Sequence, residues 1–465
     1  MKIKINKILM AMSLIVAILL SGCHKKNNDD SFVIDSLEEA RGNIQNGALA
    51  NELGVPKSIN HQLDVSISGI EQVYISDEAI YVPDVPAMYT MECSRIELDA
   101  EYRKRVAEGI FGDSAISVYD GQPTKAECEY CIEYYQKIKD CPDVAYSTIY
   151  SNMIEEYTDL KRKAPDIREK NTDFSSNQYI GIINNQQYLL TFKENAGYCS
   201  SVYLSLYPDI SVYNFFGITE GFGAVESWGS LLDNETIYSD IMNQENLSDE
   251  TAENNTCIYT EDEAVENAYS YLNCITDMPM LFAFTNPLFV AYFQGTTDNE
   301  YHINDGYDIT FIPEVSGVKQ YAAGLYYVDY MNSEYKNQSN MYDDTHGIVT
   351  NGTIFRVALA SNGLVGIGCD MPMEKRSELE KANLLSWDEI VIALEASIDG
   401  YYTKHKTDYL QIRFNSIELS YYPKETDTGF IYVPVWVFAE IDEKINEPVQ
   451  LIMLDAQTGD VVEIK

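Results

Sequence analysis

Two cysteines, Cys128 and Cys131, have the Cys-x-x-Cys spacing that is typical of redox-active dithiols and of zinc sites. Redox chemistry at such a pair needs a stabilised thiolate, which forms near positive side chains or at a helix N-terminus. The surrounding side chains are instead acidic: Glu127, Glu129 and Glu133. Cys141 supplies a third zinc ligand, but a fourth is missing. We therefore interpret the pair as part of a helix face or of a structural disulfide.

The other side chains that could take part in catalysis are scattered along the sequence. The histidines are His24, His61, His302, His346 and His405. No two of them have the four-residue spacing that places a metal-binding pair on one helical face. Ser316 and Lys319 match the SxxK pattern of penicillin-recognising enzymes, but they fall in a predicted strand turn and have no KTG partner. We predict no catalytic residue, no metal ligand and no cofactor, and hence a protein that is not an enzyme.

The N-terminal residues have the order of a secretory signal. Lys2, Lys4 and Lys7 form a basic region, and a predominantly apolar run follows at 8–20. A membrane-spanning helix needs roughly 18 to 20 apolar residues, so this run is too short to be one. The pattern predicts a signal that is removed on export.

The tetrapeptide LSGC at 20–23 resembles the lipobox of bacterial lipoproteins. In that motif the cysteine thiol receives a diacylglyceryl group, and the preceding peptide bond is then cleaved. The resemblance implies that Cys23 is the lipid attachment site and that residues 1–22 are a lipoprotein signal peptide. Two acyl chains suffice for stable anchoring, so we expect the mature chain on the extracytoplasmic face of the cell membrane. Ordinary secretion with a free Cys23 is the alternative.

The charge of the chain limits its partners. The formal net charge is −41 over 465 residues, which excludes a nucleic-acid-binding role. A surface with this much negative charge also repels anionic lipid headgroups. The charge therefore favours either a partner with a basic face or a role that only keeps the protein soluble.

Besides Cys23, the chain has Cys93, Cys128, Cys131, Cys141, Cys199, Cys257, Cys274 and Cys369. An even number of cysteines outside the cytoplasm permits disulfides, but the irregular spacing reveals no pairing. Buried free thiols, which behave as small apolar side chains, are the other interpretation.

The hydrophobic pattern predicts an α+β fold of antiparallel sheets with helices packed on one face, in two domains. Residues 23–58 are predicted to be a lipid anchor and tether, and 59–232 an N-terminal α+β domain. Capping and periodicity signals predict helices at 98–111, 124–139 and 146–163 and a hairpin at 179–183 and 187–192. The run 233–256 is acidic, without any basic residue, and is predicted to be a linker.

The C-terminal domain, predicted to span 257–465, has one plan that occurs twice. A capping box at Thr260 and Glu263 opens a helix, and strands are predicted at 288–293 and 307–312. A second capping box at Ser386 and Glu389 opens another helix. Strands are then predicted at 410–421, 430–440, 449–455 and on to residue 464. The pattern predicts a duplicated helix-meander unit.

Several runs resemble a family of uncharacterised clostridial surface lipoproteins. They are VPDVPAMYTMECSRIELD (82–99) with the helix that ends at FGD, GYDITFIPEVSGV (306–318), LLSWDEI (384–390), VPVWVF (433–438) and LDAQTGDVVEI (454–464). The C-terminal half is also similar in plan to the PepSY-like and YycH/YycI-like extracytoplasmic modules. The resemblance implies an export-side binding or regulatory role, with no catalytic residues to carry over. The chain departs from YycH and YycI in its lipid anchor.

The sequence thus predicts a lipid-anchored binding or regulatory protein that contacts a surface protein or peptide through residues 257–465. Two alternatives stay open: a solute-binding lipoprotein of a transporter, with parallel sheets in two lobes, and an exported hydrolase without a recognisable motif. Trp436 lies in the apolar run VPVWVF and is predicted to be a core side chain.

Overall fold

The computed structural model describes residues 47–63, 72–77, 80–112, 114–139, 147–168, 170, 173–194, 200–207, 214–217, 222–225, 255–293, 300–321, 353–361, 363–377, 379–404, 411–426, 429–442 and 447–464. All of them fall in the second of two compact units, residues 43–465. Within these ranges no helix is both long and apolar enough to span a membrane. The predicted signal peptide, Cys23 and most of the predicted linker lie outside the described residues, as do His24, His346, His405, Cys141 and Cys199.

The fold is α+β with mostly antiparallel strand pairs, as the sequence predicts. The largest sheet has 11 strands. In spatial order they are β4 (Ser117–Val118), β5 (Gln178–Ile183), β6 (Gln186–Glu194), β7 (Ser200–Leu206), β14 (Gly363–Asp370), β13 (Ile354–Ala360), β11 (Glu300–Val315), β10 (Met280–Phe293), β9 (Phe222–Val225) and β8 (Asn214–Gly217), with β12 (Val318–Lys319) beside β11.

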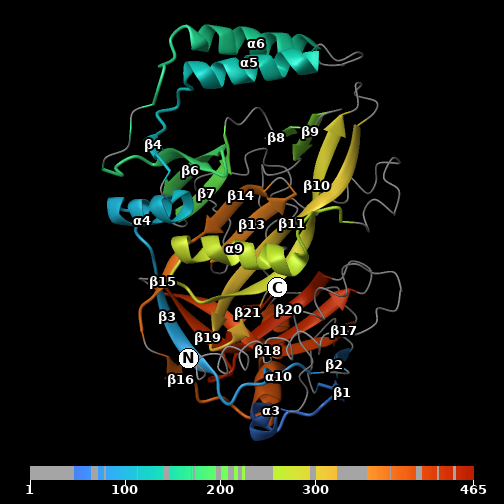
Figure 1. Cartoon of the computed structure of the whole chain (residues 1–465). Coiled ribbons are helices and arrows are strands. Elements are labelled where there is room, and N and C mark those ends of the chain that lie inside the picture. The colour runs from blue at the N-terminus through green and yellow to red at the C-terminus, as the bar shows by residue number, and fades with distance from the viewer. Residues whose placement is uncertain are drawn as a thin grey trace, which may run out of the picture. The chain divides into compact units, whose positions relative to one another are not determined.

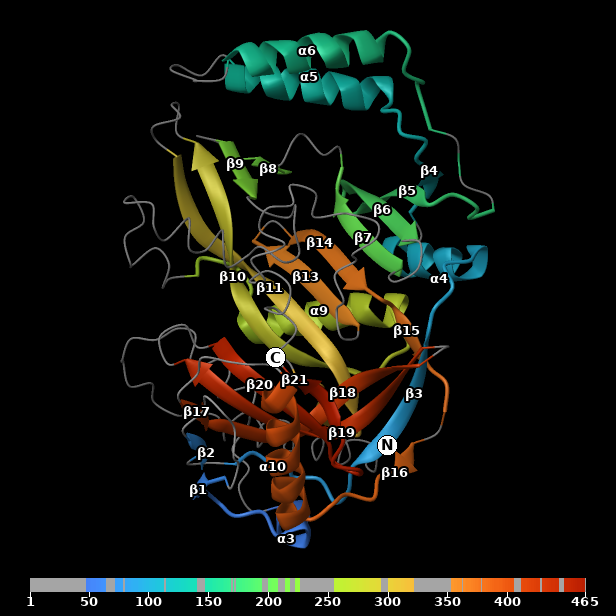
Figure 2. The ribbon, with the colours of Figure 1, turned by 180° about the vertical axis from the view of Figure 1, so that it is seen from behind.

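Two helices, α4 (Ala100–Phe111) and α9 (Glu261–Ile275), pack on one face of this sheet (Figures 1 and 2). The ring of Tyr269 in α9 meets Phe311 of β11 edge-on at 4.6 Å between centroids, and Tyr102 in α4 meets Phe192 of β6 at 6.2 Å. Asp308 and Arg356 alternate along their strands with apolar residues of this face, so they point to the opposite face. There they form a buried ion pair.

The second sheet has seven strands. They are β15 (Met373–Lys375), β3 (Tyr89–Arg95), β19 (Gly429–Asp442), β20 (Glu447–Asp455) and β21 (Val461–Ile464) in spatial order, with β16 (Glu380–Lys381) beside β3 and β18 (Ser416–Thr426) beside β19. Helix α10 (Trp387–Lys404) packs on it, since Trp387 contacts Trp436 at 5.1 Å between ring centroids. Trp436 is fully buried, which confirms its predicted place in the core.

A third, three-stranded sheet joins β1 (Ile59–Gln62), β2 (Gln72–Asp77) and β17 (Gln411–Phe414), and the pair of β2 and β17 is parallel. The short helix α3 (Ala48–Leu53) precedes it in the chain. All three sheets contain strands from before and after 233–256: β2 pairs with β17, β3 with β19, and β7 with β14. Strand pairing therefore joins the two regions that the sequence predicts to be separate domains. The strands of the two predicted helix-meander units also belong to different sheets.

Helices α5 (Lys125–Lys139) and α6 (Ser147–Lys161) form a hairpin with a small core of its own, in which the ring of Tyr135 stacks on Tyr150 and Tyr157. Arg168 follows the hairpin. Its guanidinium lies 4.9 Å from the ring centre of Tyr119 and 5.3 Å from that of Tyr207, and it forms a buried ion pair with Glu127. This contact attaches the hairpin to the end of β7.

Local signals in the sequence are confirmed where they concern caps and turns. The backbone N–H of Thr260 donates to Glu263 and that of Glu263 to the Thr260 hydroxyl, so the predicted capping box opens α9. The turn between β5 and β6 holds Asn184 and Asn185 at φ of 49° and 67°, a conformation that asparagine tolerates. Strand β10 begins at Met280, eight residues before the predicted strand, and its pairing shifts register between Pro287 and Phe289.

Candidate functional site

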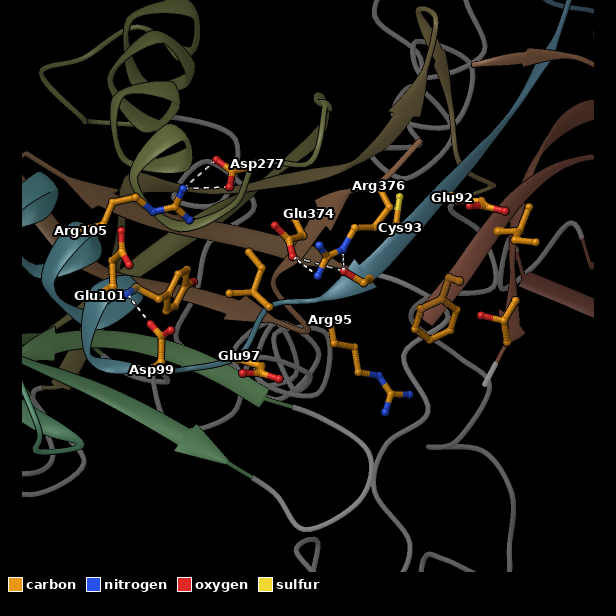
Figure 3. A pocket seen from close by; sticks show the side chains of 16 residues that line it. Glu92, Cys93, Arg95, Glu97, Asp99, Glu101, Arg105, Asp277, Glu374 and Arg376 are labelled. Atoms are coloured by element: carbon orange, nitrogen blue, oxygen red, sulfur yellow. Dashed lines mark hydrogen bonds and ion pairs between the residues drawn. The ribbon is translucent and has the colours of Figure 1, made fainter. Parts of the chain in front are cut away.

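An open groove of about 1090 Å³ lies where β3 leaves its sheet and the chain runs on into α4 (Figure 3). We call it the β3 groove. It is lined by residues of β3 and the first two turns of α4, by Asp277 after α9, by β15 and its end, and by the start of β19. Six carboxylates and three guanidinium groups face it. The groove is therefore a charged surface, assembled from distant parts of the chain.

The local sequence explains how the chain turns there. Beyond β3 the backbone N–H of Ile96 donates to the carbonyl of Pro372 at 3.0 Å, which keeps this stretch extended beside the second sheet. Asp99 then accepts a hydrogen bond from the backbone N–H of Tyr102 at 2.8 Å, so it is the N-cap of α4. The strand and the first turn of the helix thus present their charged side chains to the same space.

Arg105 is fixed at the helix end of the groove. Its Nη1 donates to both carboxylate oxygens of Asp277, at 2.9 and 2.8 Å, and the guanidinium lies 5.2 Å from the ring centre of Tyr102. The hydroxyl of Tyr102 donates to the carbonyl of Ile275 at 2.6 Å. These contacts join α4 to the end of α9.

The other two arginines also have carboxylate partners. Arg376 lies 2.5 Å from Glu374, and the Ser94 hydroxyl donates to the same carboxylate at 3.3 Å. Arg95 pairs with Glu425 at 3.1 Å and lies 5.5 Å from the ring centre of Phe430. All three guanidinium charges of the groove are therefore compensated.

Three glutamates of the groove, Glu92, Glu97 and Glu101, are exposed and form no hydrogen bond or ion pair through their carboxylates with any described residue. Figure 3 shows Glu97 and Glu101 on the side of Asp99 and α4, and Glu92 on the other side of Arg95. After the arginine pairs are taken into account, the groove keeps a net negative charge.

Cys93 also lines the groove, but its thiol is unreactive. Its Sγ lies 3.4 Å from Sδ of Met278. Burial raises the pKa of the thiol to about 12, an effect that Lys375 opposes and Glu92 reinforces. The thiol is protonated near neutral pH and is a poor nucleophile.

This gives a test of the two thiols whose pKa is raised to about 12. We expect Cys93 and Cys131 to react with iodoacetamide at pH 8 on the order of a thousand times more slowly in the folded chain than in urea, because a pKa of about 12 leaves far less thiolate than an ordinary thiol. Mass spectrometry of the labelled peptides measures both rates. Equal rates in the folded and unfolded chain would contradict the burial of these groups.

The structure does not bring the other sequence candidates into one site. Cys128 and Cys131 are buried free thiols of α5, and burial raises the pKa of both. Ser316 lies in the exposed turn between β11 and β12, with φ of 53°. His61 is an exposed residue of β1. The part of the chain that the structure describes holds no group of three His, Cys, Asp or Glu side chains able to bind a metal.

No pattern in the sequence predicts the β3 groove. The predicted helix at 98–111 covers part of its charged stretch 92–105, no strand is predicted at 92–97, and charges on a helix are ordinarily interpreted as a solvated face. The only available signal is the density of charge in this stretch, ECSRIELDAEYRKR.

Comparisons with known proteins add little. No family model and no curated protein matches the sequence. A crystal structure of an uncharacterised protein from Eubacterium rectale ATCC 33656 is similar to this chain, with 12% sequence identity and a TM-score of 0.34 over 94% of this chain and 100% of that chain. A TM-score this low supports no conclusion about function.

Proposed function

We propose that this chain is a lipid-anchored extracytoplasmic binding protein that contacts a protein partner through the β3 groove. The observation that carries the proposal is the groove itself, an open and charged surface of about 1090 Å³. Pockets for small molecules are mostly apolar and enclose their ligands. Arginine and aromatic side chains such as Arg95, Arg105, Tyr102 and Phe430 are instead enriched at protein interfaces.

The groove changes where the contact is expected. The sequence predicts a contact through residues 257–465, but the groove takes its β3 and α4 side chains from 92–105. Both regions are needed to form it, so the proposal applies to the whole mature chain.

The location part of the proposal rests on Cys23. We expect Cys23→Ala to block lipidation, so the chain is no longer labelled by a radioactive fatty acid and its signal peptide stays uncleaved. Cys257→Ala, which removes a half-buried thiol elsewhere, should leave both labelling and cleavage unchanged. Continued lipid labelling of the Cys23 variant would contradict the anchor.

The contact part is tested by photo-crosslinking in intact cells. A benzophenone side chain at position 97, inside the groove, is expected to crosslink to a protein partner. The matched control is the same group at position 133, where an exposed glutamate of α5 lies outside the groove. Both changes remove one negative charge. The proposal is wrong if the two positions give the same crosslinks or if position 97 gives none.

A further inference from the structure

We infer that the α5–α6 hairpin is a hinged unit of the fold: it moves on the large sheet as one rigid piece, and the Arg168 guanidinium locks it in place. The hairpin has a core of its own, and none of its described residues belongs to the core clusters of the sheets. The hairpin core consists of Cys131, Tyr134, Tyr135, Tyr150, Met153, Ile154 and Tyr157. A helix pair that packs on itself keeps its shape when its position changes.

Two short segments connect the hairpin to the large sheet, and we call them the hinge segments. Both start at the same edge of the sheet, because Ser117 of β4 pairs with Ile180 of β5 and also with Lys170. The first, residues 119–123, contains Gly121 at φ of 85°, where a Cβ would meet no atom within 4 Å. The second, residues 162–168, is neither helix nor strand. Changes of backbone angle at a few such residues are enough to move a rigid element.

Arg168, in the second hinge segment, contacts the first hinge segment, the hairpin and the end of β7 at once. Its Nη1 donates to the carbonyl oxygen of Gln122 at 2.8 Å, its Nη2 donates to the hydroxyl of Tyr207 at 3.0 Å, and it forms the buried ion pair with Glu127 of α5. The Tyr207 hydroxyl also donates to Glu127, at 3.4 Å. A single guanidinium therefore fixes both hinge segments and the hairpin against the end of β7.

The two ends of the hairpin are held together by separate contacts. The backbone N–H of Lys125 donates to the carbonyl of Pro165 at 2.9 Å, and Nζ of Lys125 pairs with Asp166 at 2.8 Å. Neither contact involves a sheet residue. When the Arg168 contacts open, the hairpin is therefore released as a closed unit, and the Glu127 carboxylate regains water instead of staying buried without a partner.

Distances measured by pulsed electron spin resonance test the inference. Spin labels are attached to p-acetylphenylalanine, a ketone side chain that avoids the native thiols, at position 156 of α6 and position 182 of β5, which are both exposed. The purified chain with no other substitution is expected to show one narrow distance. Arg168→Ala should add a second distance in more than about a tenth of the molecules, because breaking a buried ion pair destabilises the locked arrangement.

Two controls separate movement from unfolding. A label pair within the hairpin, at the exposed positions 133 and 156, should keep its distance in every variant. Arg162→Ala, which breaks an exposed ion pair with Asp159, should leave the distance between 156 and 182 unchanged. Tyr207→Phe removes only a hydroxyl and is used if Arg168→Ala does not fold. It should also add the second distance, in a smaller fraction of the molecules.

An unchanged distance between 156 and 182 in both Arg168→Ala and Tyr207→Phe would overturn the inference, because contacts other than those of Arg168 would then hold the hairpin. A changed distance between 133 and 156 would overturn it too, by showing that the hairpin unfolds instead of moving. Neither result affects the proposed function, which depends on the crosslinks from position 97.

Discussion

Trp436→Ala is expected to lower the free energy of unfolding by roughly 3 to 5 kcal/mol. The indole is fully buried in β19 and packs edge-on against Trp387 of α10, with 5.1 Å between ring centroids. Alanine would leave a cavity at the contact that holds α10 on the second sheet. Urea unfolding of the purified chain, followed by tryptophan fluorescence and circular dichroism, measures the loss.

The control for this substitution is Ile392→Ala, a residue of α10 that is 65% exposed and whose loss should change stability by no more than about 0.5 kcal/mol. A Trp436→Ala chain with unchanged stability and lost partner binding would show that Trp436 is a binding residue instead.

Arg168→Ala is expected to cost a similar amount, roughly 3 to 5 kcal/mol, because it leaves Glu127 as a buried and unpaired carboxylate. The two side chains are 7% and 6% exposed. The substitution also removes the cation that lies over the rings of Tyr119 and Tyr207. Urea unfolding again gives the magnitude, and limited proteolysis shows whether the α5–α6 hairpin is cut first.

Arg162 offers the matched control. Arg162 follows α6 directly and its pair with Asp159 of that helix is exposed, so Arg162→Ala should cost less than about 1 kcal/mol. Adding Glu127→Gln to an Arg168→Met chain should recover part of the loss, because no charge is then left buried. If Arg168→Ala is no more harmful than Arg162→Ala, the buried pair does not hold the hairpin.

The sequence predicted the helices well because their signals are local. The capping box at Thr124 and Glu127 lies at the start of α5, which runs to Lys139 as predicted. The order of strands is not local. Strand β3 pairs with β19, which lies more than 300 residues later in the chain. Hydrophobic periodicity predicts the strand at 430–440 but not β3, and it carries no information about which strands are neighbours.

The predicted length of strand β10 was too short for a specific physical reason. Strand β10 begins with the apolar run 280–284, and Pro287 follows three residues later; a proline within a run argues against a strand. The structure accommodates it at a shift of register with β11. A bulge of this kind depends on the partner strand, so it could not be predicted from the run alone.

The β3 groove was beyond prediction for the same reason as the strand order. The pair of Arg105 with Asp277 joins residues 172 positions apart, and that of Arg95 with Glu425 joins residues 330 apart. Until these pairs are known, every charge in 92–105 looks solvated. The glutamates without an ion pair can be identified only after the partners of the arginines are known.

The central claim is that a protein partner occupies the β3 groove, and amide hydrogen exchange of the mature chain tests it most directly. With the partner captured from position 97 purified and added in excess, exchange should slow in residues 92–105 and 429–431, which include lining residues of the groove. Exchange in the α5–α6 hairpin, residues 125–161, should not change. Protection that is confined to the hairpin, or that leaves 92–105 unchanged, would contradict the claim.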